Sequence, residues 1–312
     1  MRTTALIAAL AGFAGLAQAE TTIALNWFPE AEHAGFYAAS AANLYKDASL
    51  DVKLLPGGPG APVLQQVATG RVDFGVSNAD EVLIARSQGV PVVAVFAPIQ
   101  TSPRVIMVHQ GSGIRKLSDL KNLTLAIEPQ APFANFLKRK LPLTGVRFVP
   151  YGGSVAPFVA DTNFAQQAYG ISEPFTAQEK GSHPINLYVS ELGYNPYTSV
   201  LVVSEKTLKE RPDLVKKVVQ ASQDGWGRYL AHPQAAETMI RAANTQVDAP
   251  VLAYGYQELK KLCVNDDTKL AGLGTMTPKR WNELAAQLEE MDVIPKGKVD
   301  ASKAWNGTFL HK

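Results

Sequence analysis

The amino-acid sequence predicts an α/β protein that contains two sheets. Short apolar runs alternate with helical patterns over residues 22–97, and the same alternation returns in the middle of the chain. After residue 204 the pattern becomes almost purely helical. Strands separated by helices imply mainly parallel sheets with right-handed crossovers. The length of 312 residues suits two domains or one large one.

Residues 1–19 are predicted to be an export signal. Arg2 supplies a positive charge near the start, and residues 5–17 carry no charge. This uncharged segment is shorter than the roughly 20 residues that span a bilayer. The sequence Ala-Gln-Ala at residues 17–19 fits a signal-peptidase site, so we expect cleavage before Glu20. Because no cysteine lies near this site, we expect a soluble periplasmic protein without a lipid anchor.

The first α/β unit is predicted from apolar runs that are bounded by turn residues. Its strands are expected at residues 22–26, 50–55, 72–76 and 90–97. Its helices are expected at residues 34–43, 61–69 and 79–87. The last strand is apolar throughout, as expected for a strand buried on both faces.

The middle of the chain is predicted to form a second α/β unit. Its strands are expected at residues 104–109, 123–127, 146–150, 168–171 and 185–189, and its helices at residues 131–140 and 173–179. A strand at residues 199–203 follows, and then helices at residues 212–230, 233–243, 249–262 and 278–290. No Gly/Ser linker separates the units, so we expect two short crossings near residues 98–104 and 194–200.

Composition and motif searches exclude several classes of function. The 30 Lys and Arg residues nearly balance the 28 Asp and Glu residues, which argues against a nucleic-acid partner. The single cysteine, Cys263, cannot form an internal disulfide. The chain contains no nucleophile elbow, no P-loop and no helical histidine pair. We therefore expect no enzyme, no metal site and no cofactor.

Residues 26–37 gather aromatic rings and a histidine at the end of the first predicted strand. In open parallel sheets, this edge carries ligand sites. Such a group stacks on a flat ring and hydrogen-bonds its edge. Packing of Trp27 and Phe36 in the core, with His33 capping a helix, is an equally good interpretation of the composition.

The spacing W-F-P-x-x-x-H-x-G-x-Y in this segment resembles the thiamine-precursor-binding group of periplasmic substrate-binding proteins (NMT1/THI5-like), a larger family that includes sulfonate, nitrate and taurine binders. Further likenesses follow in order: LYK at 44–46, LDV at 50–52, GGPG at 57–60, GRVDFGV at 70–76, SEPF at 172–175 and YTSVLVV at 197–203. The resemblance covers residues 22–230. Ser49 departs from it, because that family usually has glycine there, and a positive φ would strain the serine.

The resemblance implies a type II periplasmic-binding-protein fold, in which two α/β lobes joined by two crossing strands enclose a ligand cleft. Residues 20–101 and 200–312 would form lobe one, and residues 102–199 lobe two. Ligand binding would favour the closed arrangement, because both lobes touch the ligand only when closed. The protein, expected to be a monomer, would deliver a small-molecule solute to an ABC permease and its ATPase in the inner membrane.

Eight residues are expected to bind the solute, from strand ends and the family resemblance. They are Trp27, His33, Tyr37, Ser77, Asn78, Gln130, Phe133 and Glu173. Trp27 and Tyr37 would form aromatic walls, and His33 would hydrogen-bond a ring heteroatom. Glu173 would either pair with ring N–H groups or only stabilise the start of its helix.

Three functions remain open at this point. The first is transport of a small aromatic heterocycle, such as a thiamine-precursor pyrimidine. The second is transport of a small anion such as a sulfonate or nitrate, for which Arg71 and Arg104 are available. The third is synthesis of the pyrimidine, as in a eukaryotic group that resembles this chain in the W…H…G stretch. That group carries a cysteine-rich motif, whereas this chain has only Cys263 and an export signal, so we expect no catalysis.

Overall fold

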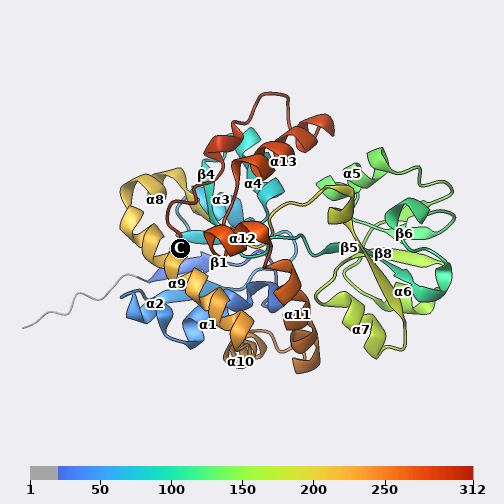
Figure 1. Cartoon of the computed structure of the whole chain (residues 1–312), viewed down its shortest axis with the longest axis horizontal. Helices are drawn as coiled ribbons and strands as arrows, with labels where there is room; N and C mark the ends of the chain where they lie inside the picture. Colours follow the sequence, from blue (N-terminus) through green and yellow to red (C-terminus); the bar gives the residue numbers. More distant parts are fainter. Residues whose placement is uncertain (1–19, 312) are drawn as a thin grey trace, which may run out of the picture.

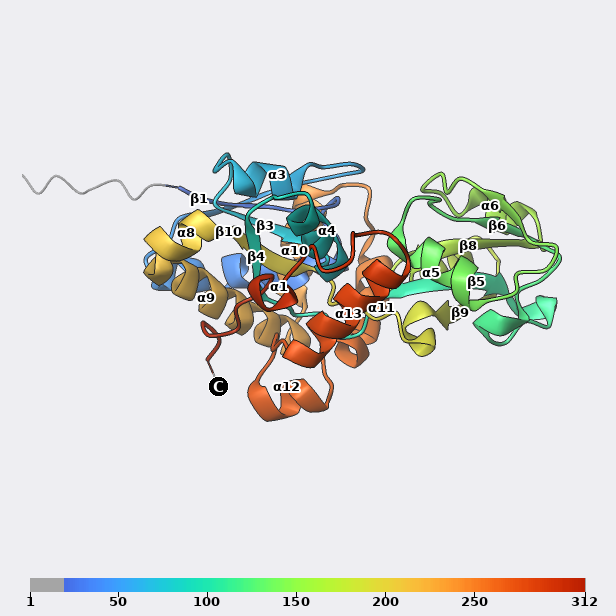
Figure 2. The same ribbon diagram turned by 90° about the horizontal axis from the view of Figure 1, so that it is seen from above.

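A computed structural model describes residues 20–311. The predicted export signal, residues 1–19, lies outside the described residues. The described chain forms two five-stranded sheets that lie next to each other along the long axis, each with helices on its faces (Figures 1 and 2). This arrangement is the two-lobed α/β fold that the sequence predicts.

The sheet of lobe one is built from two separate parts of the chain. Its strands are β1 (Thr21–Ala24), β2 (Val52–Leu55), β3 (Phe74–Ser77), β4 (Val92–Phe96) and β10 (Val200–Ser204). They lie in the order β2-β1-β3-β10-β4. β1 is parallel to β2 and β3, whereas β10 is antiparallel to β3 and β4. The chain therefore returns from lobe two into the middle of the first sheet.

Helices cover both faces of this sheet. They are α1 (Ala34–Ala41), α2 (Leu44–Asp47), α3 (Val63–Ala68), α4 (Ala79–Ser87), α8 (Glu205–Glu210), α9 (Pro212–Ala231), α10 (Gln234–Ala243), α11 (Ala249–Leu262), α12 (Asp266–Ala271) and α13 (Pro278–Glu290). In Figure 1, α3, α4 and α13 lie on one side of the sheet, and α1, α9 and α10 on the other. The contact between α1 and α9 requires Gly35, because a Cβ there would lie 2.0 Å from the Trp226 ring.

Lobe two has a mixed sheet with helices on both faces. Its elements are β5 (Arg104–His109), β6 (Thr124–Ala126), β7 (Arg147–Val149), β8 (Phe164–Tyr169), β9 (Pro184–Tyr188), α5 (Pro132–Lys140), α6 (Ala156–Ala160) and α7 (Glu173–Glu179). The strand order is β7-β6-β8-β5-β9. β6 is parallel to both neighbours, but β5 is antiparallel to β8 and β9. The antiparallel strands β5 and β10 are the ones that directly follow the two crossings.

One predicted strand is wrong in its position. The sequence places a strand at residues 168–171, whereas β8 covers Phe164–Tyr169. The two adjacent glutamines of this segment, Gln166 and Gln167, are polar residues typical of a loop, but both are buried. Gln167 accepts a 2.6 Å hydrogen bond from the Glu128 backbone N–H, which satisfies its buried oxygen. The short helices α2, α6, α8 and α12 are also absent from the prediction.

The two crossings run side by side between the lobes. Ile99 and Thr198 form an antiparallel bridge, in which the Thr198 N–H donates to the Ile99 carbonyl at 3.1 Å. Both residues are buried. The predicted pair of crossings is thus confirmed, and a relative rotation of the lobes would have to bend both of them together.

Ser49 has the conformation that its departure from the family pattern predicts. Its φ is +58°, in the left-handed region that favours glycine. The turn that precedes β2 therefore carries local backbone strain, which a glycine would relieve.

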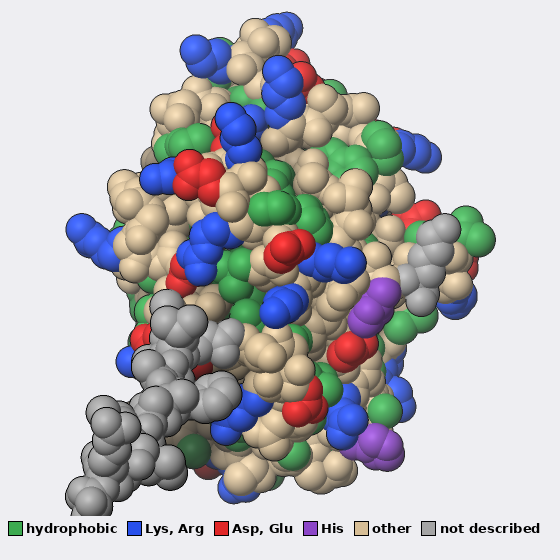
Figure 3. Space-filling model, turned by 90° about the vertical axis from the view of Figure 1, so that its left-hand side faces the viewer, with side chains coloured by type: hydrophobic (Ala, Val, Ile, Leu, Met, Phe, Trp, Pro, Cys, Tyr) green, Lys and Arg blue, Asp and Glu red, His purple; other side chains and the backbone are tan. Residues whose placement is uncertain are grey.

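The end of lobe one that faces away from lobe two carries interspersed positive and negative side chains (Figure 3). Mixed charge of this kind favours solubility and gives no large field of one sign. No helix within residues 20–311 has the length and apolar character needed to cross a membrane.

Candidate ligand-binding site

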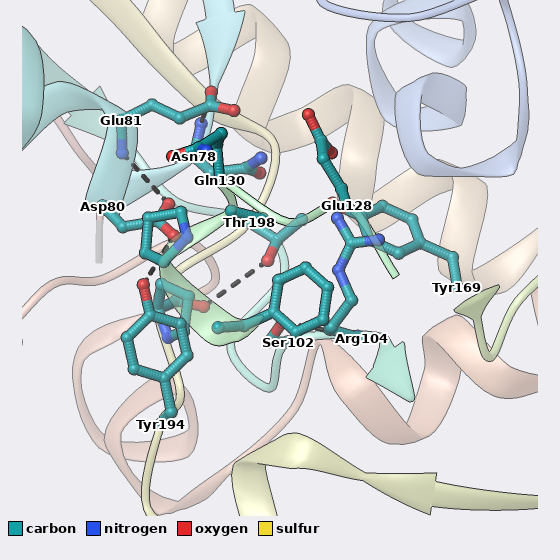
Figure 4. Close-up of a pocket in the computed structure, with 14 residues that line it drawn as sticks. Asn78, Asp80, Glu81, Ser102, Arg104, Glu128, Gln130, Tyr169, Tyr194 and Thr198 are labelled. Atoms are coloured by element: carbon teal, nitrogen blue, oxygen red, sulfur yellow. Dashed lines mark hydrogen bonds between the residues drawn. The ribbon is translucent and has the colours of Figure 1, made fainter. Parts of the chain in front are cut away.

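A cavity of about 210 Å³ lies between the lobes. It is lined by the start of α4 from lobe one, by the segment that joins β6 to α5 in lobe two, and by both crossings (Figure 4). A cavity of about 150 Å³ holds benzene, so this one has room for a substituted one-ring molecule. The carboxyl ends of β3 and β6 meet here, which is where open α/β sheets bind ligands.

The start of α4 brings two carboxylates to the cavity. Asp80 is largely buried, and its Oδ2 accepts a 2.7 Å hydrogen bond from the Tyr194 hydroxyl. Burial raises the pKa of Asp80, and the hydrogen bond from Tyr194 opposes that rise. Glu81 is exposed, and its Oε2 accepts hydrogen bonds from Ser77 Oγ at 2.5 Å and Asn78 N at 3.1 Å. Both carboxylates thus sit where the dipole of α4 stabilises negative charge.

Arg104 enters the cavity from the first crossing, between two aromatic rings of lobe two. Its guanidinium carbon lies 4.7 Å from the centroid of the Phe133 ring and 4.3 Å from that of the Tyr169 ring. Figure 4 shows the guanidinium next to the Tyr169 ring. Among residues 20–311, this guanidinium forms no salt bridge and no side-chain hydrogen bond. The cation–π contacts with the two rings hold it in place.

Glu173 of lobe two and Glu30 of lobe one are near enough for their charges to interact. Glu173, at the start of α7, accepts hydrogen bonds from the Tyr151 hydroxyl at 3.1 Å, Tyr169 N at 3.0 Å and Ser172 Oγ at 2.6 Å. Burial, together with the negative charge of Glu173, raises the pKa of Glu30 in lobe one to about 8. The negative charges of these two glutamates, one from each lobe, therefore repel each other.

Three of the eight predicted binding residues line the cavity, namely Asn78, Gln130 and Phe133. Each follows the end of a strand, β3 or β6, as the prediction required. Ser77 lies next to this group, but it is buried and its hydroxyl is used by Glu81.

Two other predicted residues lie in the core of lobe one. His33, in the short helix Ala31–His33, is fully buried, and its Nε2 lies 3.0 Å from Asn26 Oδ1. Burial lowers the pKa of His33 to about 3, so its imidazole is neutral. Tyr37 is also buried, with an exposed fraction of 4%. The structure therefore gives both side chains a packing role and brings neither to the cavity.

The last two predicted residues lie away from the cavity lining. Trp27 is half-buried and packs edge to face on Phe28, with ring centroids 5.5 Å apart. Glu173 has protein partners for both of its oxygens. A ligand contact by either residue stays a prediction.

Among the lining residues that sequence reasoning missed are Asp80, Glu81, Glu128, Tyr169 and Tyr194. An acidic pair in the first turn of a helix after a strand was the available signal for the carboxylates. Tyr169 ends β8, whose bounds the sequence misplaces. Tyr194 precedes the second crossing, and no local pattern shows that it meets α4. Within residues 20–311, no group of three or more His, Cys, Asp or Glu side chains is arranged to hold a metal ion.

The fold and the interlobe cavity define the class of two-lobed proteins with a periplasmic binding protein fold. The chain belongs to the NMT1/THI5 like family, whose model matches residues 30–236. It is similar to the riboflavin-binding protein RibY of Chloroflexus aurantiacus, with 24% identity over 93% of this chain and 86% of the relative.

The chain is also similar to an enzyme in sequence and to a solved binding protein in structure. A 4-amino-5-hydroxymethyl-2-methylpyrimidine phosphate synthase of Candida albicans is 26% identical over 69% of this chain and 68% of the synthase. The solved structure of the periplasmic aliphatic sulphonate binding protein SsuA from Escherichia coli has a TM-score of 0.69. Its identity is 17%, and the match covers 94% of both chains, so this likeness shows the fold alone.

Proposed function

We propose that this protein is the exported solute-binding component of an ABC importer and that it binds a small aromatic heterocycle between its lobes. The observation that carries the proposal is the composition of the interlobe cavity. The rings of Phe133 and Tyr169 offer flat apolar surface, and the carboxylates of Asp80 and Glu81 accept N–H donors. A flat ring with polar edges needs both kinds of contact.

Two observations support the transport role: the two crossings between the lobes, and membership of the NMT1/THI5 like family. The two crossings let the lobes close on a ligand that touches both, and closure would mark the loaded protein for a permease. In this account the lobes are residues 20–101 with 200–312, and residues 102–199. The protein acts as a periplasmic monomer that delivers solute to an inner-membrane permease and its ATPase.

A binding role fits the cavity better than the synthase activity of the Candida relative. Cys263, the single cysteine of the sequence, is fully buried in the core of lobe one and does not line the cavity. Burial raises its pKa above the ordinary thiol value, so the thiol is neutral and inert. No catalytic step is part of the proposal.

Transport of an anion is the second candidate, because Arg104 lines the cavity. Arg71 is exposed and does not line it. The carboxylates of Asp80, Glu81 and Glu128 share the cavity with Arg104 and would repel an anion. A heterocycle with N–H donors matches these walls better than a sulfonate or nitrate does.

A thermal-shift screen of the purified mature protein tests the proposal. Flavins and pyrimidines are compared with sulfonates and nitrate, because a ligand that binds only the folded state raises the melting temperature by mass action. We expect a shift with a heterocycle that Phe133→Leu removes. Phe148→Leu, on the exposed surface of the same lobe, is the matched control and should keep the shift. Shifts with sulfonates or nitrate and none with heterocycles would refute the proposal.

A further inference from the structure

Arg104 fills the space between the Phe133 and Tyr169 rings, here called the aromatic slot. A guanidinium is a flat, permanently charged group that stacks on aromatic faces. In the slot it lies 4.7 Å from one ring centroid and 4.3 Å from the other. Since no hydrogen bond or ion pair in residues 20–311 fixes it, the guanidinium can leave the slot without breaking a polar contact within the protein.

Carboxylates of several elements share the cavity with Arg104. Asp80 and Glu81 come from α4, and Glu128 from the segment after β6 (Figure 4). Glu32 of lobe one does not line the cavity; it is 3% exposed, and its Oε2 has no hydrogen-bond partner within residues 20–311. The positive charge of Arg104 lowers the pKa of Asp80 and Glu32, against the larger rise that burial causes.

Among the described residues that line the cavity, Arg104 is the single Lys or Arg. The remaining charged groups of the lining are all acidic, so the field at the slot favours a positive group. Cation–π attraction acts in the same direction, because the faces of Phe133 and Tyr169 carry negative potential.

We propose that the aromatic slot binds a flat organic cation, such as an amidinium, a guanidinium or a protonated amino-heterocycle, and that Arg104 occupies the slot while the protein is empty. This inference rests on the proposed function and narrows its ligand class. The ligand displaces the guanidinium from the rings, and its N–H groups donate to the carboxylates of α4. A cation replaces a cation, so the carboxylates keep a positive neighbour.

A neutral ring of the same size would bind less well. When it displaced Arg104, the carboxylates would lose their positive neighbour and receive none in exchange. An anion would share the cavity with three acidic side chains. The competing account is that Arg104 itself is a receptor for an anion, and the two accounts give opposite results for one set of probes.

The test uses benzamidine, benzamide and benzoate, which have nearly the same shape and carry a positive, a zero and a negative charge at neutral pH. Each is titrated calorimetrically into the full mature protein. We expect benzamidine to bind at least about tenfold more tightly than benzamide, the size of effect that cation–π and charge-assisted contacts give. We expect no heat of binding from benzoate.

Two variants separate the roles. Arg104→Gln removes the occupant of the slot, so benzamidine should bind as tightly as to the original protein or several-fold more tightly. Glu81→Gln removes an acceptor and should weaken benzamidine about tenfold. Arg71→Gln and Glu283→Gln, at exposed positions away from the cavity, are the matched controls and should change nothing.

Several outcomes would overturn the inference. They are equal binding of benzamide and benzamidine, no binding of benzamidine, and binding of benzoate that Arg104→Gln abolishes. If a neutral flavin or pyrimidine binds while benzamidine does not, the inference fails and the proposed function stands. If benzamidine binds and no heterocycle does, the cation slot stands and the heterocycle function fails.

Discussion

The guanidinium carbon of Arg280 lies 3.7 Å from the centre of the Tyr197 ring, so α13 of lobe one contacts the second crossing. Nη2 of the same residue donates to the Gln100 carbonyl at 2.6 Å and to the Asn195 carbonyl at 2.9 Å. One side chain therefore joins both crossings to the body of lobe one.

Arg280→Ala should lower the free energy of unfolding by roughly 2–3 kcal/mol, because hydrogen bonds from a charged donor contribute more than neutral ones. Urea unfolding followed by circular dichroism measures the change. Lys279→Ala, at the exposed neighbouring position, should stay within about 0.5 kcal/mol. Equal losses in the two variants would show that Arg280 does not hold the crossings.

Tyr194→Phe should cost about 1–3 kcal/mol, because it leaves the buried Asp80 carboxylate without its 2.7 Å donor. It should also raise the pKa of Asp80 further above its ordinary value of 3.8. An acid with a raised folded-state pKa contributes stability at low pH that is lost as pH rises. The loss should thus be larger at neutral pH than near the ordinary pKa of Asp.

The control for Tyr194→Phe is Tyr256→Phe, whose hydroxyl donates to the Leu230 carbonyl and not to a carboxylate. Its cost should not vary with pH. Stability curves of both variants over acidic to neutral pH measure the contrast. Parallel curves would contradict the assigned role of Tyr194.

His33 should contribute a step to the acid denaturation of the protein. Burial lowers the pKa of His33 from 6.5 to about 3. Between these values the unfolded chain binds a proton that the folded chain does not, so stability falls as pH decreases through this window. His33→Gln should flatten that part of the stability curve, and the curve of His232→Gln, a change at an exposed position, is the comparison. An unaltered slope in His33→Gln would mean that His33 takes up a proton in the folded state.

Trp27→Ala should abolish heterocycle binding without unfolding the protein, if Trp27 forms an aromatic wall as the sequence predicts. Its half-buried ring contacts the Phe28 ring, so loss of either ring removes this packing contact. A comparison of the two variants therefore distinguishes an effect on packing from an effect on ligand binding. Phe28→Ala removes the exposed partner and should keep most of the affinity. Calorimetric titration with circular dichroism on both variants measures this, and unchanged affinity in Trp27→Ala would assign the ring to packing.

Much of the fold follows from local patterns in the sequence. Apolar runs and helical periodicity place most strands and all long helices within a few residues of their positions. β8 is the exception, because the buried Gln166 and Gln167 imitate a loop. Their place between β5 and β6 depends on pairing with residues far along the chain.

In the candidate site, the sequence predicts only residues that come after the end of a strand. Asn78, Gln130 and Phe133 obey that rule and line the cavity. Within the aromatic segment at residues 26–37, His33 and Tyr37 are buried in lobe one, where Trp226 packs on Gly35, and a ligand contact by Trp27 stays a prediction. A contact between residues so far apart in sequence decides between packing and binding, and local spacing does not reveal it.

Native mass spectrometry of the protein isolated from the periplasm in which it is expressed tests the central claim most directly. The account predicts one bound flat heterocycle per chain, kept in Phe148→Leu and lost in Phe133→Leu. A bound sulfonate or nitrate, or a heterocycle that Phe133→Leu retains in full, would contradict it.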